Sequence, residues 1–192
     1  RIKLRKEFFN YRNSQKLIKK FNKPKLITIT NVLAQIPNLK DFVKGLKNLL
    51  NEKNIIVIEF PYLVDMIKSS IFDVIYHEHL SYFSLTPLDY LFKKNNIKML
   101  DFERINFGAS GPAIRLYLSN DISIFKQSKK INKILKQEKV WEIKKIKRYK
   151  KFKIQVKNKI KKLKEIILSK HQQKFKLGCF TASSKEIGRA HV

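Results

Sequence analysis

The sequence predicts an α/β protein built around a parallel sheet. Two short β-branched runs, 26–30 and 55–60, flank a segment with the apolar spacing of an amphipathic helix, 39–50. Strand, helix and strand in this order form a βαβ unit with a right-handed crossover. The third observation is a lysine-rich tract, 126–173, whose apolar residues recur at helical spacing.

The chain before the first strand predicts a helix over residues 1–22. Its apolar residues recur at near-helical spacing, and Pro24 then excludes helix for the residue before it. Both strands of the βαβ unit are continuous apolar or β-branched runs, so we expect them to be buried. A turn at 51–54 separates the helix from the second strand.

Residues 62–125 have a different composition, with no basic residue between Lys68 and Lys93. A helix over about 86–95 is predicted, with Thr86 as its N-cap and Pro87 as its first helical residue. The later predicted elements are a strand at 97–105, a glycine-rich turn at 107–112, a strand at 113–118 and a strand at 174–180.

The lysine-rich tract carries one apolar stripe. Its members follow a 4-4-3-4 spacing: Phe152, Val156, Ile160, Leu163 and Ile167. One interpretation is a coiled coil or a nucleic-acid-binding arm. The other, which charge runs favour, is a helix that faces the core and presents its lysines to solvent.

Composition limits the function classes. The net charge is +28, which suggests an anionic partner, yet 36 of the 43 basic residues are lysine, whereas base readout favours arginine. Lys, Ile and Asn share A/T-rich codons, which offers a genomic source for the charge, so no nucleic-acid partner is predicted. The longest apolar run, 55–58, predicts no membrane span. One cysteine, Cys179, allows no internal disulfide or cysteine-rich zinc site, and a cytoplasmic location is the expectation.

The two ends of the chain carry little functional weight. The chain begins with Arg1 rather than Met, which suggests a start inside a gene. Residues 187–192 match what one reading frame of a common sequencing adapter encodes, so we interpret them, His191 included, as a sequencing-adapter artefact without functional weight.

The densest chemical cluster lies at 72–84. His77, Glu78 and His79 stand in a row, flanked by Tyr76 and Tyr82. Histidine exchanges protons near neutral pH, and aromatic rings offer flat faces to a sugar or a purine. A His-x-His pair also binds metals, but further ligands are scarce here, and a single histidine is more often structural.

A second group of candidates follows from the parallel sheet. Ligands of open parallel sheets bind at the carboxyl ends of the strands. The residues at those ends are Thr30, Asn31, Glu59, Pro61 and Tyr62.

Four strings of this sequence resemble the S-adenosylmethionine-dependent sugar C-methyltransferases. They are residues 31–39, residues 59–62, residues 76–85 and the turn ahead of Ile114-Arg115-Leu116-Tyr117. The resemblance covers most of residues 1–185, and the Tyr-His-Glu-His-x-x-Tyr-Phe-Ser-Leu string is its most specific part.

The resemblance implies a fold and a domain organisation. The fold would be a partial Rossmann-like methyltransferase sheet followed by an α/β carboxyl-terminal domain with a long basic helix. Residues 1–60 would be the carboxyl-terminal half of the S-adenosylmethionine domain, and residues 61–185 a truncated C-methyltransferase carboxyl-terminal domain. A zinc-binding domain, the glycine-rich cofactor loop and the acidic ribose ligand would precede Arg1, and the fragment would be inactive alone.

The resemblance also implies roles for individual residues. His79 would be the general base, with Tyr76 and Glu78 beside the reacting sugar. The cofactor would be bound by Thr30, Asn31 and Gln35, the nucleotide-linked keto-sugar by His77, Tyr82 and Arg115, and no metal is expected in these residues. The base would remove the proton next to the ketone, and the enolate carbon would take the methyl group.

Two departures from the family pattern bear on substrate choice. Many relatives carry histidine where Gln35 stands, and glutamine cannot act as a base. The turn reads Gly111-Pro112-Ala113 instead of the commoner Gly-Gly-Ser.

Two alternative functions stay open. One is a methyltransferase acting on oxygen or nitrogen of another small molecule, and the other is a lysine-rich nucleic-acid-binding module.

Overall fold

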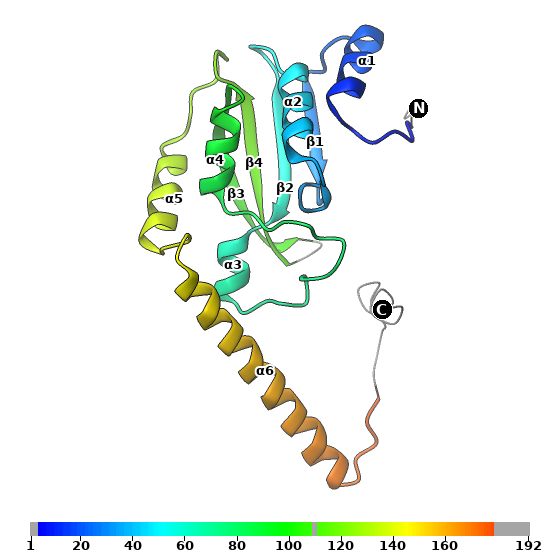
Figure 1. Cartoon of the computed structure of the whole chain (residues 1–192), viewed down its shortest axis with the longest axis vertical. Helices are drawn as coiled ribbons and strands as arrows, with labels where there is room; N and C mark the ends of the chain where they lie inside the picture. Colours follow the sequence, from blue (N-terminus) through cyan, green and yellow to red (C-terminus); the bar gives the residue numbers. More distant parts are fainter. Residues whose placement is uncertain (1–3, 109–110, 179–192) are drawn as a thin grey trace.

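The computed structural model describes residues 4–108 and 111–178 and has a mixed α/β architecture (Figure 1). Its elements in chain order are α1 (Tyr11–Phe21), β1 (Leu26–Thr30), the 3₁₀ helix η1 (Leu33–Gln35), α2 (Leu39–Leu49), β2 (Ile55–Pro61), α3 (Leu63–Lys68), α4 (Leu85–Lys93), β3 (Ile97–Gly108), β4 (Gly111–Asn120), α5 (Lys129–Val140) and α6 (Ile146–Gln172).

One four-stranded sheet forms the centre of the molecule, in the order β1-β2-β4-β3. β1 and β2 pair directly in parallel, and α2 connects them along the chain, which confirms the predicted βαβ unit. β4 pairs antiparallel with both β2 and β3. The sheet therefore contains strands from both sides of residue 60. It is continuous, and the division into two domains near residue 60 stays a prediction.

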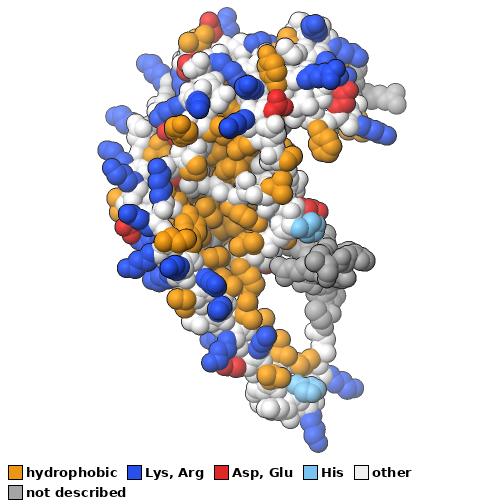
Figure 2. Space-filling view, viewed as in Figure 1, with side chains coloured by type: hydrophobic (Ala, Val, Ile, Leu, Met, Phe, Trp, Pro, Cys, Tyr) orange, Lys and Arg blue, Asp and Glu red, His pale blue; other side chains and the backbone are white. Residues whose placement is uncertain are grey.

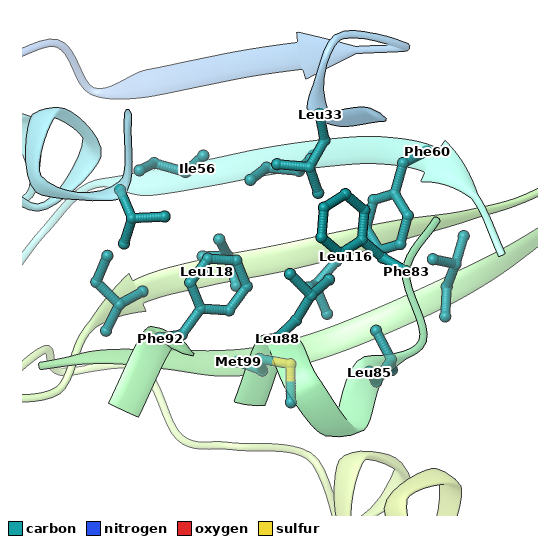
Figure 3. Packing of buried hydrophobic residues seen from close by; sticks show 14 of the residues in the cluster. Leu33, Ile56, Phe60, Phe83, Leu85, Leu88, Phe92, Met99, Leu116 and Leu118 are labelled. Carbon is teal, nitrogen blue, oxygen red and sulfur yellow. The ribbon is translucent and has the colours of Figure 1, made fainter. Parts of the chain in front are cut away.

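The hydrophobic core lies on one face of the sheet, which α2, α4 and α5 cover. Alternate residues of β2, Ile56, Ile58 and Phe60, point into it and are at most 1% exposed. They pack against residues of the three helices and of β3 and β4, several of which Figure 3 labels. The residues between them, including Val57 and Glu59, lie on the opposite face and are only half-buried.

The first helix is shorter than the sequence predicts. Residues 4–10 are not helical, and α1 begins at Tyr11. The reason is local, because the Asn10 side chain accepts a hydrogen bond from the Asn13 backbone N–H at 2.8 Å and so caps the helix at this point. The apolar spacing that includes Phe8 and Phe9 continues beyond the helix without extending it.

The prediction that both strands are buried is wrong for β1. Its residues alternate between exposed and half-buried, and Leu26 is 58% exposed. Among the described strands, β1 pairs only with β2, so it forms an edge of the sheet. A β-branched run indicates a strand but does not reveal how many neighbours that strand has.

The predicted cap of the fourth helix is also wrong. α4 begins one residue earlier than Thr86, and its N-cap is Ser84, whose side chain makes no capping hydrogen bond. A carboxylate from α5, Glu138, occupies the capping position instead. A contact over more than fifty residues of sequence has replaced the local cap that the sequence suggested.

The interpretation of the lysine-rich tract as a core-facing helix holds for α5 and fails for α6. Ile131 and Ile134 of α5 are buried, whereas none of the 27 residues of α6 is. Figure 1 shows α6 leading away from the sheet, and the apolar stripe expected to face the core is largely exposed, with Leu163 at 58%. Figure 2 shows lysine and arginine side chains spread over the length of the molecule in that view.

The strand predicted at 174–180 does not form in its described part. Residue 174 lies in a turn and residues 175–178 have no regular structure. Cys179, the remainder of that segment and the suspected adapter residues 187–192 lie outside the described residues.

Candidate functional site

The carboxyl ends of the two parallel strands meet at one edge of the sheet, as the sequence predicts. Thr30 lies opposite Glu59 in the β1–β2 register. Asn31 then leaves the sheet with a left-handed backbone, φ 55°, a conformation that asparagine tolerates better than most residues. Its N–H donates to the Glu59 carbonyl at 2.9 Å, which holds the turn against β2.

The segment with the histidines is docked against this same edge. It has no helix or strand of its own between α3 and α4, but the N–H groups of Leu80 and Ser81 both donate to the Ala34 carbonyl in η1, at 2.8 and 3.2 Å. Further along, Phe83 bridges to Tyr62 at the end of β2. The tertiary structure thus brings the second group of candidate residues close to the first. We call residues 71–84 the histidine loop.

His79 is the buried member of the loop, with 8% of its surface exposed. Its Nδ1 lies 2.9 Å from the Val74 carbonyl oxygen, and its Nε2 lies 3.2 Å from the Tyr76 hydroxyl. A carbonyl oxygen only accepts hydrogen bonds, so Nδ1 carries the proton in the neutral ring. Nε2 then keeps its lone pair and accepts from Tyr76, which makes Nε2 the atom able to take a further proton.

Tyrosine rings enclose this imidazole. The Tyr76 and His79 ring centroids are 4.4 Å apart, and those of His79 and Tyr82 are 5.9 Å apart. The Tyr82 hydroxyl donates to the Val74 carbonyl at 3.2 Å, and burial raises the pKa of Tyr82 above its usual value. Tyr82 therefore remains a hydrogen-bond donor at neutral pH and shares the Val74 carbonyl with His79.

His77 and Glu78 lie differently from His79. Both are exposed, at the outer side of a turn that the His79 N–H closes onto the Tyr76 carbonyl at 3.0 Å. The loop is irregular, so the alternation of a strand does not decide which side chains share a face. Burial and hydrogen bonding distinguish His79 from its two neighbours.

The expected cofactor residues gather at the end of β1. Thr30 and Gln35 are exposed and Asn31 is half-buried, so all three side chains are accessible to a ligand above the strand ends. Their hydroxyl and amide groups suit the hydrogen-bonding groups of a nucleoside and an amino acid. Their role in binding S-adenosylmethionine stays a prediction.

Arg115 lies on β4, and its guanidinium is held by carboxylates of the neighbouring strands. Its Nη2 and Nε lie 2.9 and 3.0 Å from one oxygen of Glu59, and Nη1 lies 3.4 Å from Glu103. The hydrogen bond to Glu59 raises the pKa of Arg115. Through Glu59 the arginine is linked to the end of β1, and its hydrogen bonds among the described residues run to the neighbouring strands β2 and β3.

Glu138 is a functional candidate that the sequence reasoning missed. This carboxylate is 1% exposed in α5 and accepts from the Tyr62 hydroxyl at 2.7 Å and from the first backbone N–H groups of α4. The sequence feature that could have drawn attention to Glu138 is the scarcity of acidic residues around it. The lysine-rich tract 126–173 holds only three, Glu138, Glu142 and Glu165. Nothing in the periodicity marked Glu138 as the buried one.

Tyr62 gives a test of this buried contact by pH. Burial, together with the charge of Glu138, raises the pKa of Tyr62 well above 10.0. Above that pH the unfolded chain releases the phenolic proton while the folded chain retains it, so the free energy of unfolding falls as pH rises. We expect wild type to lose about 1.4 kcal/mol per pH unit relative to Tyr62→Phe above pH 10.

Urea denaturation of both proteins between pH 8 and roughly 11.5 measures this difference. The lysines and the other tyrosines are common to the two proteins, so their titration cancels in the comparison. Parallel curves for wild type and Tyr62→Phe across this range would contradict the burial of the Tyr62 hydroxyl.

Metal and membrane features are absent from the described part of the chain. Across residues 4–108 and 111–178, no group of three or more His, Cys, Asp or Glu side chains is placed to hold a metal ion. None of the helices in those residues has the length and apolar character needed to cross a membrane.

Comparisons with known proteins point to one family. Residues 109–187 match the model of the C-methyltransferase C-terminal domain. C-methyltransferase NovU of Streptomyces niveus is 40% identical over 68 residues, which are 35% of this chain and 16% of that protein. A solved SAM-dependent methyltransferase from Anabaena variabilis is 12% identical, with a TM-score of 0.44 over 58% of this chain and 55% of its own. The family match and the NovU alignment confirm the resemblance that the sequence motifs indicated, and residues 109–187 are similar to the C-methyltransferase C-terminal domain.

Proposed function

We propose that this chain is part of an enzyme that uses S-adenosylmethionine to methylate a carbon of a nucleotide-linked keto-sugar. The observation that carries the proposal is the environment of His79, a buried imidazole whose Nδ1 is bound to a carbonyl and whose Nε2 accepts from a tyrosine. The similarity of residues 109–187 to the C-methyltransferase C-terminal domain, and the alignment with NovU, support methyl transfer to carbon. The aligned stretch spans 16% of NovU, so the activity of the whole protein is itself part of this proposal.

In the proposed reaction His79 is the general base. Its Nε2 takes the proton from the carbon next to the ketone, the C–H electron pair moves into an enolate, and negative charge grows on the ketone oxygen. Nε2 has a single lone pair, so the Tyr76 hydroxyl must turn away from it to donate to the ketone oxygen, and this frees Nε2 to take the proton. S-adenosylmethionine held by Thr30, Asn31 and Gln35 would supply the electrophilic methyl group, and its S–CH₃ bond would break as the enolate carbon takes up the methyl group, so that S-adenosylhomocysteine would leave.

Other residues of the chain orient these groups. Val74 holds the His79 ring in one tautomer through its carbonyl, and Tyr82 binds the same carbonyl. Thr30, Asn31 and Gln35 contact the cofactor, while His77, Glu78 and Tyr82 contact the sugar. Arg115 contributes through its contact with Glu59 rather than as an unpaired cation. A cytoplasmic location is proposed from the single cysteine alone.

The decisive experiment uses S-adenosylmethionine labelled with ¹³C in the methyl group and an intact enzyme that contains this chain. We expect the product of a nucleotide-linked keto-sugar to carry the label on carbon. If the sugar is also enriched in ¹³C, the methyl resonance is split by one-bond coupling to the ring carbon. A methyl resonance without this splitting would place the methyl group on oxygen or nitrogen and overturn the proposal in favour of the alternative chemistry.

A further inference from the structure

Among the described residues, the carboxylate with the most hydrogen bonds is that of Glu138, near the carboxyl end of α5 on the side that buries Ile131 and Ile134. Its Oε1 accepts from the Tyr62 hydroxyl and from the Leu85 N–H, both at 2.7 Å. Its Oε2 accepts from the Thr86 N–H at 2.8 Å and from the Thr86 hydroxyl. Four donors thus converge on one side chain that is 1% exposed.

These donors give hydrogen-bond partners to both oxygens of a buried carboxylate. Two of them are unpaired N–H groups in the first turn of α4, where the helix dipole also favours negative charge. The Ser84 side chain makes no capping hydrogen bond, so Glu138 takes its place. The Tyr62 hydroxyl remains a donor because its pKa is raised by burial and by the carboxylate itself.

The donors come from the two ends of one segment. Tyr62 directly follows β2, and Leu85 begins α4, so the chain between them contains α3 and the whole histidine loop. The same two ends are joined a second time, since Phe83 bridges to Tyr62 and the Leu63 N–H donates to the Phe83 carbonyl at 3.0 Å. Glu138 therefore binds the closure point of the segment that carries His79.

Backbone hydrogen bonds attach the loop to neighbouring parts of the fold at two places. Between Ile71 and Ser84 it has no helix, and its long-range backbone hydrogen bonds run to Ala34 and Leu63. His79 lies six residues before Leu85, so a displacement of the start of α4 is transmitted through a short, irregular stretch. Both hydrogen-bond partners of the imidazole, Val74 and Tyr76, belong to the same loop, so the hydrogen bonds of its ring depend on the conformation that the loop adopts between its two ends.

We propose that Glu138 is a positioning residue, which fixes both ends of the histidine loop and so keeps the His79 ring in the tautomer with its lone pair on Nε2. The functional meaning of this role rests on the proposed function, in which Nε2 is the base. The positioning itself is a property of the fold. It connects the region that matches the C-methyltransferase C-terminal domain, residues 109–187, to a loop that lies outside that match.

Nitrogen-15 NMR of the histidine side chains in this chain tests the positioning directly. The chain has four histidines, and His79→Asn identifies the resonances of His79. In wild type we expect the Nδ1–H tautomer to predominate for His79. Glu138→Gln replaces two acceptors by one acceptor and an NH₂ group that faces the Thr86 donors, and we expect a several-fold rise in the population of the Nε2–H tautomer.

Two matched controls separate positioning from general stability. Glu142→Gln changes an exposed carboxylate just beyond α5. Ile134→Ala truncates a buried apolar side chain of α5, which makes no hydrogen bond to Glu138 or its donors. Both should leave the His79 tautomer unchanged, although Ile134→Ala lowers the melting temperature. A fall in melting temperature for Glu138→Gln with an unchanged tautomer would overturn the proposal and leave Glu138 a purely structural residue.

Thr86→Ala keeps the measurement informative if Glu138→Gln fails to fold. It removes one of the four donors and leaves the carboxylate and both backbone donors in place, so a smaller tautomer shift in the same direction is expected, and no shift counts against the proposal. In an active enzyme, Glu138→Gln should lower kcat about 10- to 100-fold and leave the KM for S-adenosylmethionine unchanged. A tautomer shift without any loss of kcat would refute the catalytic role of His79 and not the positioning by Glu138.

Discussion

Replacing His79 by asparagine is expected to slow removal of the sugar proton by about 10²- to 10⁴-fold, the usual contribution of one general base. The amide preserves a polar side chain of similar size but offers no imidazole nitrogen to accept the proton. Substrate affinity should change little, because the proton is transferred after binding. The enzyme to use is an intact one that contains this chain.

Exchange of the proton next to the ketone with deuterated solvent, measured without S-adenosylmethionine, isolates this step from methyl transfer. His77→Asn is the matched control, since it makes the same chemical change at an exposed position two residues away. A wild-type exchange rate in His79→Asn would identify another residue as the base. A greater loss at His77 than at His79 would reverse the assignment of the two histidines while leaving the family unchanged.

Truncation of Phe60 to alanine is expected to have the largest effect on stability, a loss of about 3–5 kcal/mol in the free energy of unfolding. Phe60 is 1% exposed at the carboxyl end of β2. Its ring meets that of Phe83 edge to face, with centroids 6.1 Å apart and planes at 83°, and Figure 3 shows the two rings side by side. The substitution leaves a cavity where the core contacts the histidine loop.

Urea denaturation gives the loss as a shift of the midpoint at constant slope. Phe60→Leu keeps most of the apolar volume and should cost under about 1.5 kcal/mol. Phe8→Ala removes the same group from a residue that is 93% exposed, and its effect should stay within about 0.5 kcal/mol. Equal losses for Phe8→Ala and Phe60→Ala would contradict the position of Phe60 in the core.

The elements near the centre of the fold follow from local pattern. β1 has the bounds that its β-branched run predicts, α2 lies within one residue of its predicted end, and β2 extends one residue beyond its predicted one. Here hydrophobic periodicity and backbone preference agree with the tertiary packing. The same periodicity predicted too long a helix for α1, because the Asn10 cap makes the helix begin at Tyr11. It also predicted that α6 would face the core, which is wrong, because an apolar stripe does not identify the surface that it packs against.

The candidate site divides in the same way. The sequence by itself singled out the residues of the histidine loop and those at the strand ends, because these residue types carry proton-transfer and ligand chemistry. Residue type and spacing did not distinguish His79 from His77, and only the family resemblance gave them different roles. The turn of the loop supplies a physical difference, because it buries one ring against the Val74 carbonyl and leaves the other exposed.

What the sequence determined, then, is the α/β class, the βαβ unit and the family motif, all of which depend on neighbouring residues along the chain. The tertiary structure alone decided that β1 is an edge strand among the described residues, that Arg115 is paired with Glu59, and that Glu138 caps α4. The physical reason is that burial, pKa and pairing of a charged group depend on side chains brought together from distant positions. Glu138 meets Tyr62 across 76 residues of sequence, a separation that no local pattern encodes.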